Sequence, residues 1–311
     1  MSPAATRVVL DCDPGIDDAI AILLALGSPE LDVVGLTTVV GNAALEHTTS
    51  NALAVLELAG RSDVPVAPGA PRALVRNWVR QEASFHGETG LGRAALPPAS
   101  RGPRDAHAVD FIAERAAEAP LTLVAVGPLT NVALLLARHP PVAERIERLV
   151  VMGGARTAGN VTPAAEFNVF VDPEAAYRAF TSGLDLTMID LDLTHQALLE
   201  PHEVEAIRAL GEGGRIVARL LDFYAASYAT SHGGPIVPLH DAVAVADLVD
   251  PGLIEKVPAR VEVEYASGPE RGRTAVELET APANVSYGLR IDRDTFAELL
   301  VERLTAVLGE G

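Results

Sequence analysis

Four aspartates fall within eight residues near the start of the chain, directly after an apolar run: Asp11, Asp13, Asp17 and Asp18. Carboxylates this close repel one another, so beside a buried strand they need a cation, backbone N–H groups or protons to offset their charge. Ca²⁺ and Mg²⁺ favour oxygen ligands of this kind. The Pro14-Gly15 turn lets Asp13 face the same pocket as Asp17 and Asp18, whereas Asp11, within the strand, is expected to point away. The sequence therefore predicts a divalent metal site at the end of its first strand.

Three other segments offer groups that suit such a site. The Gly127-Pro128 turn is expected to leave the carbonyl of Val126 unpaired in the strand ladder, where it can bind a cation, although turn geometry alone also explains Gly-Pro. His240-Asp241 opens an apolar helix. Asp241 is either a further metal ligand or a helix N-cap, and His240 is either an acid or a packed core residue. Asn42 ends the second predicted strand, where its amide is either a site residue or a cap.

A second polar motif suits a sugar. Glu166 and Asn168 alternate with Phe167, so their side chains can share one face, and Asn160 precedes them in the same segment. Hydroxyl-rich ligands are bound by this mixture of carboxylates and amides. A capped loop with exposed polar residues is the alternative.

The elements that must position these residues alternate between short apolar strands and helices. Strands are predicted at residues 7–10, 31–40, 64–66, 121–126, 148–152 and 186–190, and helices at 17–26, 48–59, 107–119, 129–138 and 173–182. Farther on, helices are predicted at 201–228, with a break at Gly213-Gly214, at 240–248 and at 294–308, the last capped by Asp292 or Asp294. Residues 259–265 and 274–278 read as an antiparallel hairpin.

This alternation predicts an α/β fold with a mainly parallel, doubly wound sheet, extra C-terminal helices and a small antiparallel hairpin, in a single domain over residues 1–311. Ligands bind at the carboxyl ends of strands in such sheets, and the suspected residues fall at these ends. The longest irregular stretch, residues 68–104, is expected to be functional.

Composition narrows the range of partners. The chain has 311 residues, 49% of them apolar, and a formal charge of −18. That charge disfavours nucleic acid, and no segment is predicted to enter a membrane. Cys12 is the single cysteine, so no intramolecular disulfide can form. With no signal peptide visible, a cytoplasmic protein is expected.

Residues 11–19, Asp-Cys-Asp-Pro-Gly-Ile-Asp-Asp-Ala, resemble the signature of the inosine-uridine preferring nucleoside hydrolase family. Further segments similar to this family recur in family order at residues 37–42, 86–90, 127–131, 151–154, 165–168, 190–195 and 240–241. The resemblance spans nearly the whole chain. It implies hydrolysis of the N-glycosidic bond of ribonucleosides to ribose and free base, with one bound Ca²⁺, in a homo-oligomer (dimer or tetramer) that serves nucleoside catabolism and salvage.

The resemblance also implies roles for particular residues. The metal ligands would be Asp13, Asp18, the Val126 backbone carbonyl and Asp241, with ribose hydroxyls and a water completing the shell. The ribose contacts would be Asp17 and Asn168 for the 2′- and 3′-hydroxyls with Asn42 nearby, Asn160 and Glu166 for the 5′-hydroxyl, and Met152 and Phe167 along the sugar. The family often has Thr where this chain has Val126, a change that a backbone ligand tolerates.

For the chemistry, the expected base that takes a proton from the attacking water is Asp13, and the expected donor to the leaving base is His240. His86 is expected to lie over the nucleobase. Tyr224 and Tyr228 share a helix face and either close over the base or belong to the core. No clear aromatic sandwich is visible, and Trp78 has no neighbouring aromatic in sequence, so a pyrimidine-preferring or broad enzyme is expected.

Two other functions compete with this interpretation. Asp11 and Asp13 also resemble the aspartate pair of a Mg²⁺-dependent phosphohydrolase, but no arginine or lysine stands within the cluster to bind phosphate. A catalytically silent nucleoside-binding protein would keep the ribose contacts and lose Asp13 or the acid, and both are present.

Overall fold

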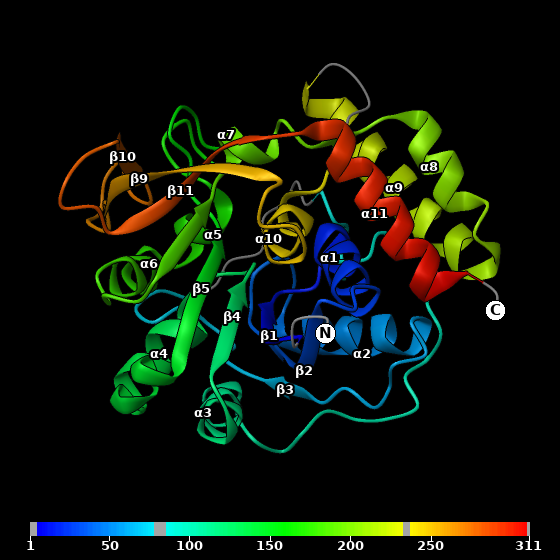
Figure 1. Cartoon of the computed structure of the whole chain (residues 1–311), viewed down its shortest axis with the longest axis horizontal. Helices are drawn as coiled ribbons and strands as arrows, with labels where there is room; N and C mark the ends of the chain where they lie inside the picture. Colours follow the sequence, from blue (N-terminus) through cyan, green and yellow to red (C-terminus); the bar gives the residue numbers. More distant parts are fainter. Residues whose placement is uncertain (1–4, 78–84, 233–236, 310–311) are drawn as a thin grey trace.

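A nine-stranded sheet runs through the protein in the order β10-β9-β11-β6-β5-β4-β1-β2-β3 (Figure 1). The computed structural model describes residues 5–77, 85–232 and 237–309, without the side chains of residues 230–232. The strands are β1 (Thr6–Cys12), β2 (Leu31–Thr38), β3 (Val66–Pro68), β4 (Leu121–Ala125), β5 (Ile146–Met152), β6 (Leu186–Ile189), β9 (Ile254–Val263), β10 (Thr274–Leu278) and β11 (Val285–Ile291). A separate antiparallel pair joins β7 (Leu198–Leu199) to β8 (Val237–Pro238).

Helices cover both faces of this sheet. They are α1 (Ile16–Leu26), α2 (Leu45–Leu58), α3 (Ala108–Glu118), α4 (Thr130–Arg138), α5 (Phe167–Val171), α6 (Pro173–Phe180), α7 (Leu191–Thr194), α8 (Pro201–Arg208), α9 (Gly211–His232), α10 (His240–Val249) and α11 (Arg293–Leu308), with a 3-10 turn η1 (Pro140–Arg145). One apolar cluster lies under α1, α2 and α8 to α11, and the other lies under α3, α4 and α6 (Figure 1). Both faces of the central parallel strands are therefore buried, as a doubly wound sheet requires.

The first six strands pair in parallel, with β1 between β2 and β4. Val8, Val9 and Leu10 have no exposed surface, which explains why β1 is a continuous apolar run rather than an alternating one. The predicted fold class is confirmed. Between β3 and α3, the described residues form neither helix nor strand, in agreement with the irregular stretch expected there.

Two details of the prediction are wrong. Residues 64–66 were expected to pair, but the strand is β3, which starts at Val66, because Pro65 has no N–H for the ladder. The helix break lies at residues 209–210 between α8 and α9, not at Gly213-Gly214. A Cβ on Gly214 would lie 2.1 Å from the Ile207 carbonyl oxygen, so this glycine allows α8 and α9 to pack closely.

The C-terminal region adds antiparallel strands to the parallel sheet. The predicted hairpin is present as β9 and β10, and the prediction missed β11, which pairs in parallel with β6 and antiparallel with β9. The N-cap of α11 is Asp292, whose carboxylate accepts the Thr295 N–H at 2.9 Å.

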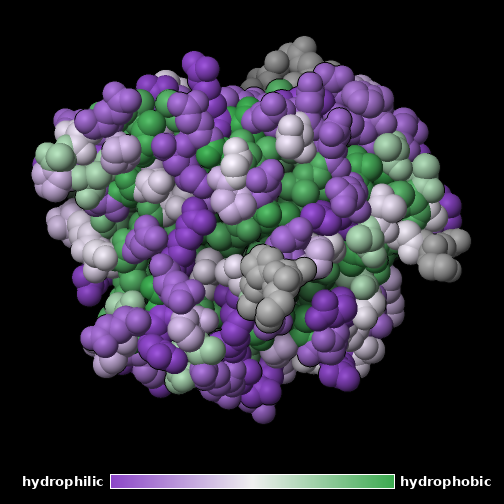
Figure 2. Space-filling view, in the orientation of Figure 1, coloured by the Kyte–Doolittle hydropathy of each residue, from purple (hydrophilic) through white to green (hydrophobic). Residues whose placement is uncertain are grey.

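Polar residues cover much of the face seen in Figure 2, with apolar residues showing between them over its centre. Among the described residues, no helix combines the length and the apolar character that crossing a bilayer needs.

A buried ion cluster ties α10 to the sheet. Asp247 on α10 has no exposed surface, and its carboxylate contacts Arg148 of β5 at 2.5 Å and also contacts Lys256 of β9. Arg148 also donates to the Thr187 hydroxyl on β6 at 2.9 Å. This cluster fixes the helix whose first residues are His240 and Asp241.

We expect Asp247→Asn to lower the free energy of unfolding by about 3 kcal/mol, because two partly buried cations lose their counter-charge. Equilibrium urea unfolding measures this change. The control is Glu262→Gln, which breaks the exposed pair with Arg260 and should cost less than about 0.5 kcal/mol. Equal losses in the two variants would contradict a special role for the buried cluster.

Candidate active site

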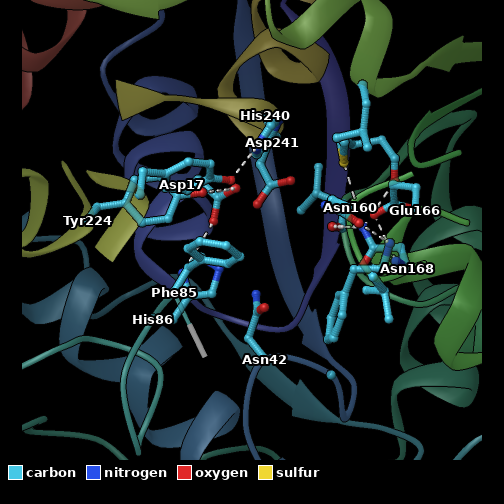
Figure 3. A pocket seen from close by; sticks show the side chains of 17 residues that line it. Asp17, Asn42, Phe85, His86, Asn160, Glu166, Asn168, Tyr224, His240 and Asp241 are labelled. Atoms are coloured by element: carbon cyan, nitrogen blue, oxygen red, sulfur yellow. Dashed lines mark hydrogen bonds and ion pairs between the residues drawn. The ribbon is translucent and has the colours of Figure 1, made fainter. Parts of the chain in front are cut away.

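A cavity of about 280 Å³ opens at the carboxyl ends of the central parallel strands (Figure 3). It is lined by Asp17, Gly41, Asn42, Phe85, His86, Val126, Met152, Asn160, Val161, Glu166, Phe167, Asn168, Leu191, Tyr224, Tyr228, His240 and Asp241. Of the predicted site residues, only Asp13 and Asp18 are missing from this lining, and both are fully buried. Acidic groups on one side of the cavity thus face Asn160, Glu166 and Asn168 on the other (Figure 3).

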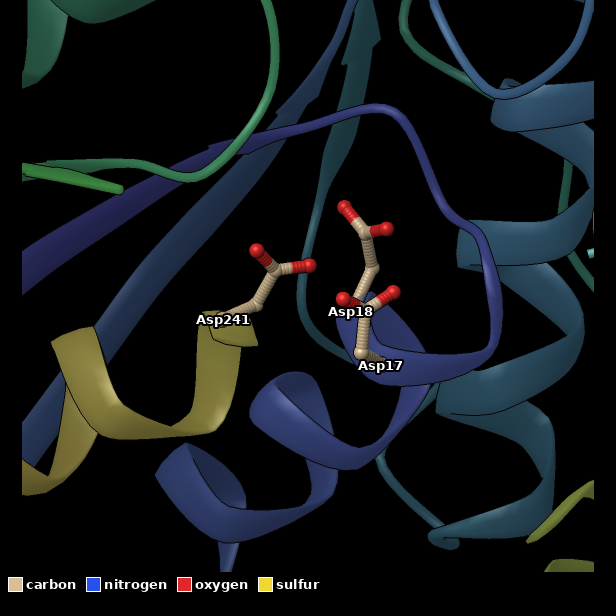
Figure 4. A group of neighbouring side chains, drawn as sticks. All are labelled: Asp17, Asp18 and Asp241. Atoms are coloured by element: carbon tan, nitrogen blue, oxygen red, sulfur yellow. The ribbon is translucent and has the colours of Figure 1, made fainter. Parts of the chain in front are cut away.

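Asp17, Asp18 and Asp241 form a carboxylate group in which one oxygen from each lies within 4.8 Å of the others (Figure 4). Asp17 and Asp18 occupy the first turn of α1, and Asp241 the first turn of α10. The Asp18 carboxylate accepts the backbone N–H groups of Gly15 at 2.8 Å and Asp13 at 3.1 Å. Packing of α1 against α10 therefore brings together acids that are far apart in sequence.

Burial dominates the electrostatics of this group. It raises the pKa of Asp17 to about 7 and, with repulsion from Asp17, the pKa of Asp18 to about 6. Burial and then repulsion from Asp17 and Asp18 raise the pKa of Asp241 well above its usual range. Protons or a bound cation would reduce the repulsion between these carboxylates.

Asp13 lies next to this group, in a space that two glycines leave open. One carboxylate oxygen, Oδ2, accepts the Asn42 backbone N–H at 2.5 Å, and the other, Oδ1, is buried with no hydrogen-bond partner in the described structure. A Cβ on Gly41 would lie 2.0 Å from Oδ2, and one on Gly127 would lie 2.5 Å from Oδ1. Burial, followed by repulsion from Asp18, raises the pKa of Asp13. Asp13 and the Val126 carbonyl stay predictions as metal ligands.

Asp11 does not line the cavity. Its carboxylate instead accepts hydrogen bonds from the Thr37 hydroxyl at 2.6 Å and the Asn131 amide at 2.7 Å.

The opposite wall is built from helix caps. Glu166 caps α5 and accepts the N–H groups of Asn168 at 2.8 Å, Gly154 at 2.9 Å and Val169 at 3.1 Å. Asn160 accepts the Phe167 N–H at 2.9 Å. Glu166 and Asn160 therefore hold the start of a short helix and also line the cavity. The alternative of a capped loop with exposed polar residues is wrong for Glu166 and Asn168, which are both buried. Burial raises the pKa of Glu166 to about 7.

Asn168 connects this wall to the strand ends. Its amide donates to the carbonyl oxygens of Val126 at 2.8 Å and Met152 at 3.1 Å. Because a carbonyl oxygen has two lone pairs, the Val126 carbonyl can accept from Asn168 and still serve a cation.

A series of polar contacts connects His240 and the two tyrosines that line the cavity. His240 contacts the Thr194 hydroxyl at 2.7 Å through Nδ1 and the Tyr228 hydroxyl at 3.0 Å through Nε2. The Tyr224 hydroxyl donates to Asp17 Oδ2 at 3.4 Å. Residues from α7, α9, α10 and α1 thus meet in one buried network.

His86 and Phe85 bring an aromatic surface to the cavity. The ring of Phe85 stacks on Tyr228 with 4.4 Å between centroids. His86 Nδ1 accepts the Ile16 backbone N–H at 3.0 Å, and burial lowers the pKa of His86 to about 4. His86 is therefore neutral at pH 7, with its proton on Nε2.

Comparison with known proteins identifies the family. The sequence model described as inosine-uridine preferring nucleoside hydrolase matches residues 8–298. The chain belongs to this family. The hydrolase is 46% identical over 304 residues to the pyrimidine-specific ribonucleoside hydrolase RihA of Shewanella sp. (strain ANA-3), covering 96% of this chain and 95% of that one. It is 44% identical over 307 residues to RihA of Escherichia coli O1:K1 / APEC, covering 96% and 98%.

Solved structures agree with this assignment. A plant nucleoside hydrolase, PpNRh1, superposes with a TM-score of 0.91 at 36% identity, covering 97% of the hydrolase and 99% of the plant chain. A purine-preferring ribonucleoside hydrolase from Gardnerella vaginalis gives 0.93 at 35% identity with the same coverage. The prediction of an enzyme that hydrolyses ribonucleoside N-glycosidic bonds is confirmed, and family membership favours it over the phosphohydrolase.

Sequence reasoning missed Phe85 and Thr194 and left Tyr224 undecided. Phe85 precedes His86, and Thr194 lies in the segment at residues 190–195. Their position in or beside segments similar to the family was the signal that could have marked them as site residues. The spacing of Tyr224 and Tyr228 pointed to a shared face. Trp78 lies outside the described residues.

We expect Ca²⁺ to raise the melting temperature by several degrees at pH 7.5 and by much less at pH 5. Asp17 and Asp18 have folded-state pKa values of about 7 and 6, above the usual value for aspartate, so in the metal-free protein stability falls as pH rises through this range. At pH 5 the cation must displace protons from Asp17 and Asp18, whereas at pH 7.5 these two carboxylates are mostly ionised. Thermal scans with and without Ca²⁺ at both pH values test this, with Asp241→Asn as a variant that should show a smaller shift. An equal shift at the two pH values would rule out binding at these carboxylates.

Proposed function

We propose that this hydrolase cleaves ribonucleosides with a preference for pyrimidine bases and uses Ca²⁺ to do so. One observation carries the proposal: the carboxylates of Asp17, Asp18 and Asp241 meet on one side of a cavity whose other side presents Asn168 and Glu166. A divalent cation and the 2′- and 3′-hydroxyls of a ribose would bind to the aspartates on the first side. The 5′-hydroxyl would bind on the side of Glu166.

The residues present fit a calcium ion. Asp13 Oδ1 and Asp17 Oδ1 are buried oxygens without a hydrogen-bond partner in the described structure, and the donor set is oxygen only. Asp13, Asp18, the Val126 carbonyl and Asp241 would hold the ion, with Asp17 beside it. When bound, Ca²⁺ would orient the ribose and activate water as a Lewis acid.

On this proposal the two walls bind the ribose from opposite sides. Asp17 and Asn168 bind the 2′- and 3′-hydroxyls with Asn42 nearby, and Asn160 and Glu166 bind the 5′-hydroxyl. Met152 and Phe167 pack along the sugar. As the base departs, C1′ gains positive charge, and the surrounding carboxylates stabilise it.

Asp13 is the proposed general base. The bond from C1′ to the base nitrogen breaks while a bond from C1′ to the water oxygen forms, and the water loses one proton. Asp13 Oδ1 is the oxygen proposed to take it, because no other described group occupies that oxygen.

The pair of His240 and Tyr228 is the proposed source of the proton that the leaving base takes up. Both side chains line the cavity, and the Tyr228 hydroxyl lies 3.0 Å from His240 Nε2. Thr194 holds the other ring nitrogen, which fixes the orientation of the imidazole.

The base preference rests on the relatives and the aromatic side of the cavity. The curated relatives at 44% and 46% identity are named pyrimidine-specific, whereas the Gardnerella enzyme at 35% is titled purine-preferring. Phe85 and Tyr228 stack on each other and both line the cavity, so they form the aromatic surface that is proposed to face the base. The family resemblance further supports a cytoplasmic homo-oligomer, dimer or tetramer, that acts in nucleoside catabolism.

We expect the enzyme to release uracil from uridine faster than hypoxanthine from inosine, and a chelator to abolish both reactions until Ca²⁺ is restored. Free base measured by chromatography over a nucleoside panel gives the rates. If nucleosides bind and no free base forms from any of them, the protein is a silent nucleoside-binding protein instead.

Replacement of His240 by Ala should lower kcat/KM for uridine roughly a hundredfold or more and change that for p-nitrophenyl riboside only a few-fold. The nitrophenolate leaves without a proton, so it does not need the donor. The control is His195→Ala, an exposed histidine whose ring lies edge-on to His240 at 5.5 Å and outside the cavity lining, and it should keep uridine turnover. Equal losses on the two substrates in His240→Ala would exclude the donor role.

A further inference from the structure

The end of the β9–β10 hairpin packs against the segment that carries Glu166, Phe167 and Asn168 (Figure 1). Arg273 forms an isolated antiparallel bridge with Ala165. A Cβ on Gly272 would lie 3.0 Å from the Ala165 Cβ and from the Phe170 Cα. The hairpin was predicted from sequence only as a structural element, and its contacts lie on the proposed sugar-binding wall.

Thr274, the first residue of β10, makes the most specific of these contacts. Its hydroxyl accepts the Ala155 N–H at 2.9 Å and donates to the Ala155 carbonyl at 2.9 Å. Thr274 is 2% exposed, so water cannot replace the hydroxyl at this point. One side chain thus satisfies both backbone groups of Ala155.

Ala155 lies in a turn that is held from two directions. On the sheet side, Gly153 donates to the Ile189 carbonyl at 3.0 Å, and the Gly154 carbonyl accepts the Leu191 N–H at 3.1 Å. On the hairpin side, Thr274 provides the contact. Gly154 has a φ of +83°, and a Cβ there would lie 2.9 Å from the Thr274 hydroxyl oxygen, so glycine is needed for this close approach.

The turn leads directly to the proposed sugar site, because the Gly154 N–H donates to Glu166 Oε2 at 2.9 Å. We propose that Thr274 is a positioning residue for recognition of the ribose 5′-hydroxyl: it fixes the turn at residues 153–155, and that turn sets the position of the Glu166 carboxylate. This inference rests on the proposed function, in which Glu166 binds that hydroxyl.

The test compares two substrates in one variant. Thr274→Val keeps the shape of the side chain and removes the hydroxyl. We expect kcat/KM for uridine to fall roughly tenfold and that for 5′-deoxyuridine to change less than about twofold, because the second substrate lacks the group that Glu166 binds. In a Glu166→Gln background the same change should cost little further activity, since both act on one contact.

The matched control is Thr274→Ser, which keeps the hydroxyl and should retain wild-type selectivity between the two substrates. Equal losses on uridine and 5′-deoxyuridine in Thr274→Val, an equal loss in Thr274→Ser, or no loss at all would each overturn the proposal.

Hydrogen exchange provides a readout that does not depend on turnover. The amides of Gly154 and Ala155 should exchange faster in Thr274→Val than in wild type and Thr274→Ser. Unchanged exchange in Thr274→Val overturns the inference whatever the enzyme's substrate is. If wild type releases no base while the exchange result holds, the proposed function fails and the structural link from Thr274 to the turn stands.

Discussion

Repulsion between buried carboxylates is the constraint on which the site depends. Asp13, Asp18 and Asp241 are almost completely removed from water and lie near Asp17. Among the described residues that line the cavity, none is a lysine or arginine that could offset their charge. The fold instead supplies backbone N–H groups from the start of α1 and a helix, α10, that the Asp247 cluster holds in place. A bound cation would neutralise the negative charge that these groups leave uncompensated.

The opposite wall is stabilised differently. Glu166 accepts three backbone N–H groups and Asn160 accepts one, and these bonds hold the start of the short helix α5. Residues that cap a helix and also face a ligand cannot shift without disturbing both. This wall therefore depends on supports outside the cavity, from the strand ends on one side and from the β9–β10 hairpin on the other.

Local patterns in the sequence predicted most of the parallel sheet and most cavity residues, because apolar runs mark buried strands and ligands collect at their carboxyl ends. Asn42, Val126 and Met152 stand at such strand ends, but their roles in the site were implied by the family resemblance. The rule did not reveal β11, whose role comes from pairing with two strands far away in sequence. Nor did it reveal the contact of Thr194 with His240. Both depend on packing between distant segments, which no local pattern encodes.

The order of the acidic residues along the chain has a consequence for biosynthesis. Asp13, Asp17 and Asp18 leave the ribosome before Asp241, which lies 223 residues after Asp18 (241 minus 18). Until α10 emerges and docks on α1, the nascent chain carries mutually repelling acids beside an apolar strand with no complete pocket to hold an ion. Domains of this size commonly fold through intermediates, and here the intermediate would keep its early acidic segment hydrated. Binding of the proposed ion would then wait for α10, so that products terminated before this helix would lack one of the carboxylates of the site.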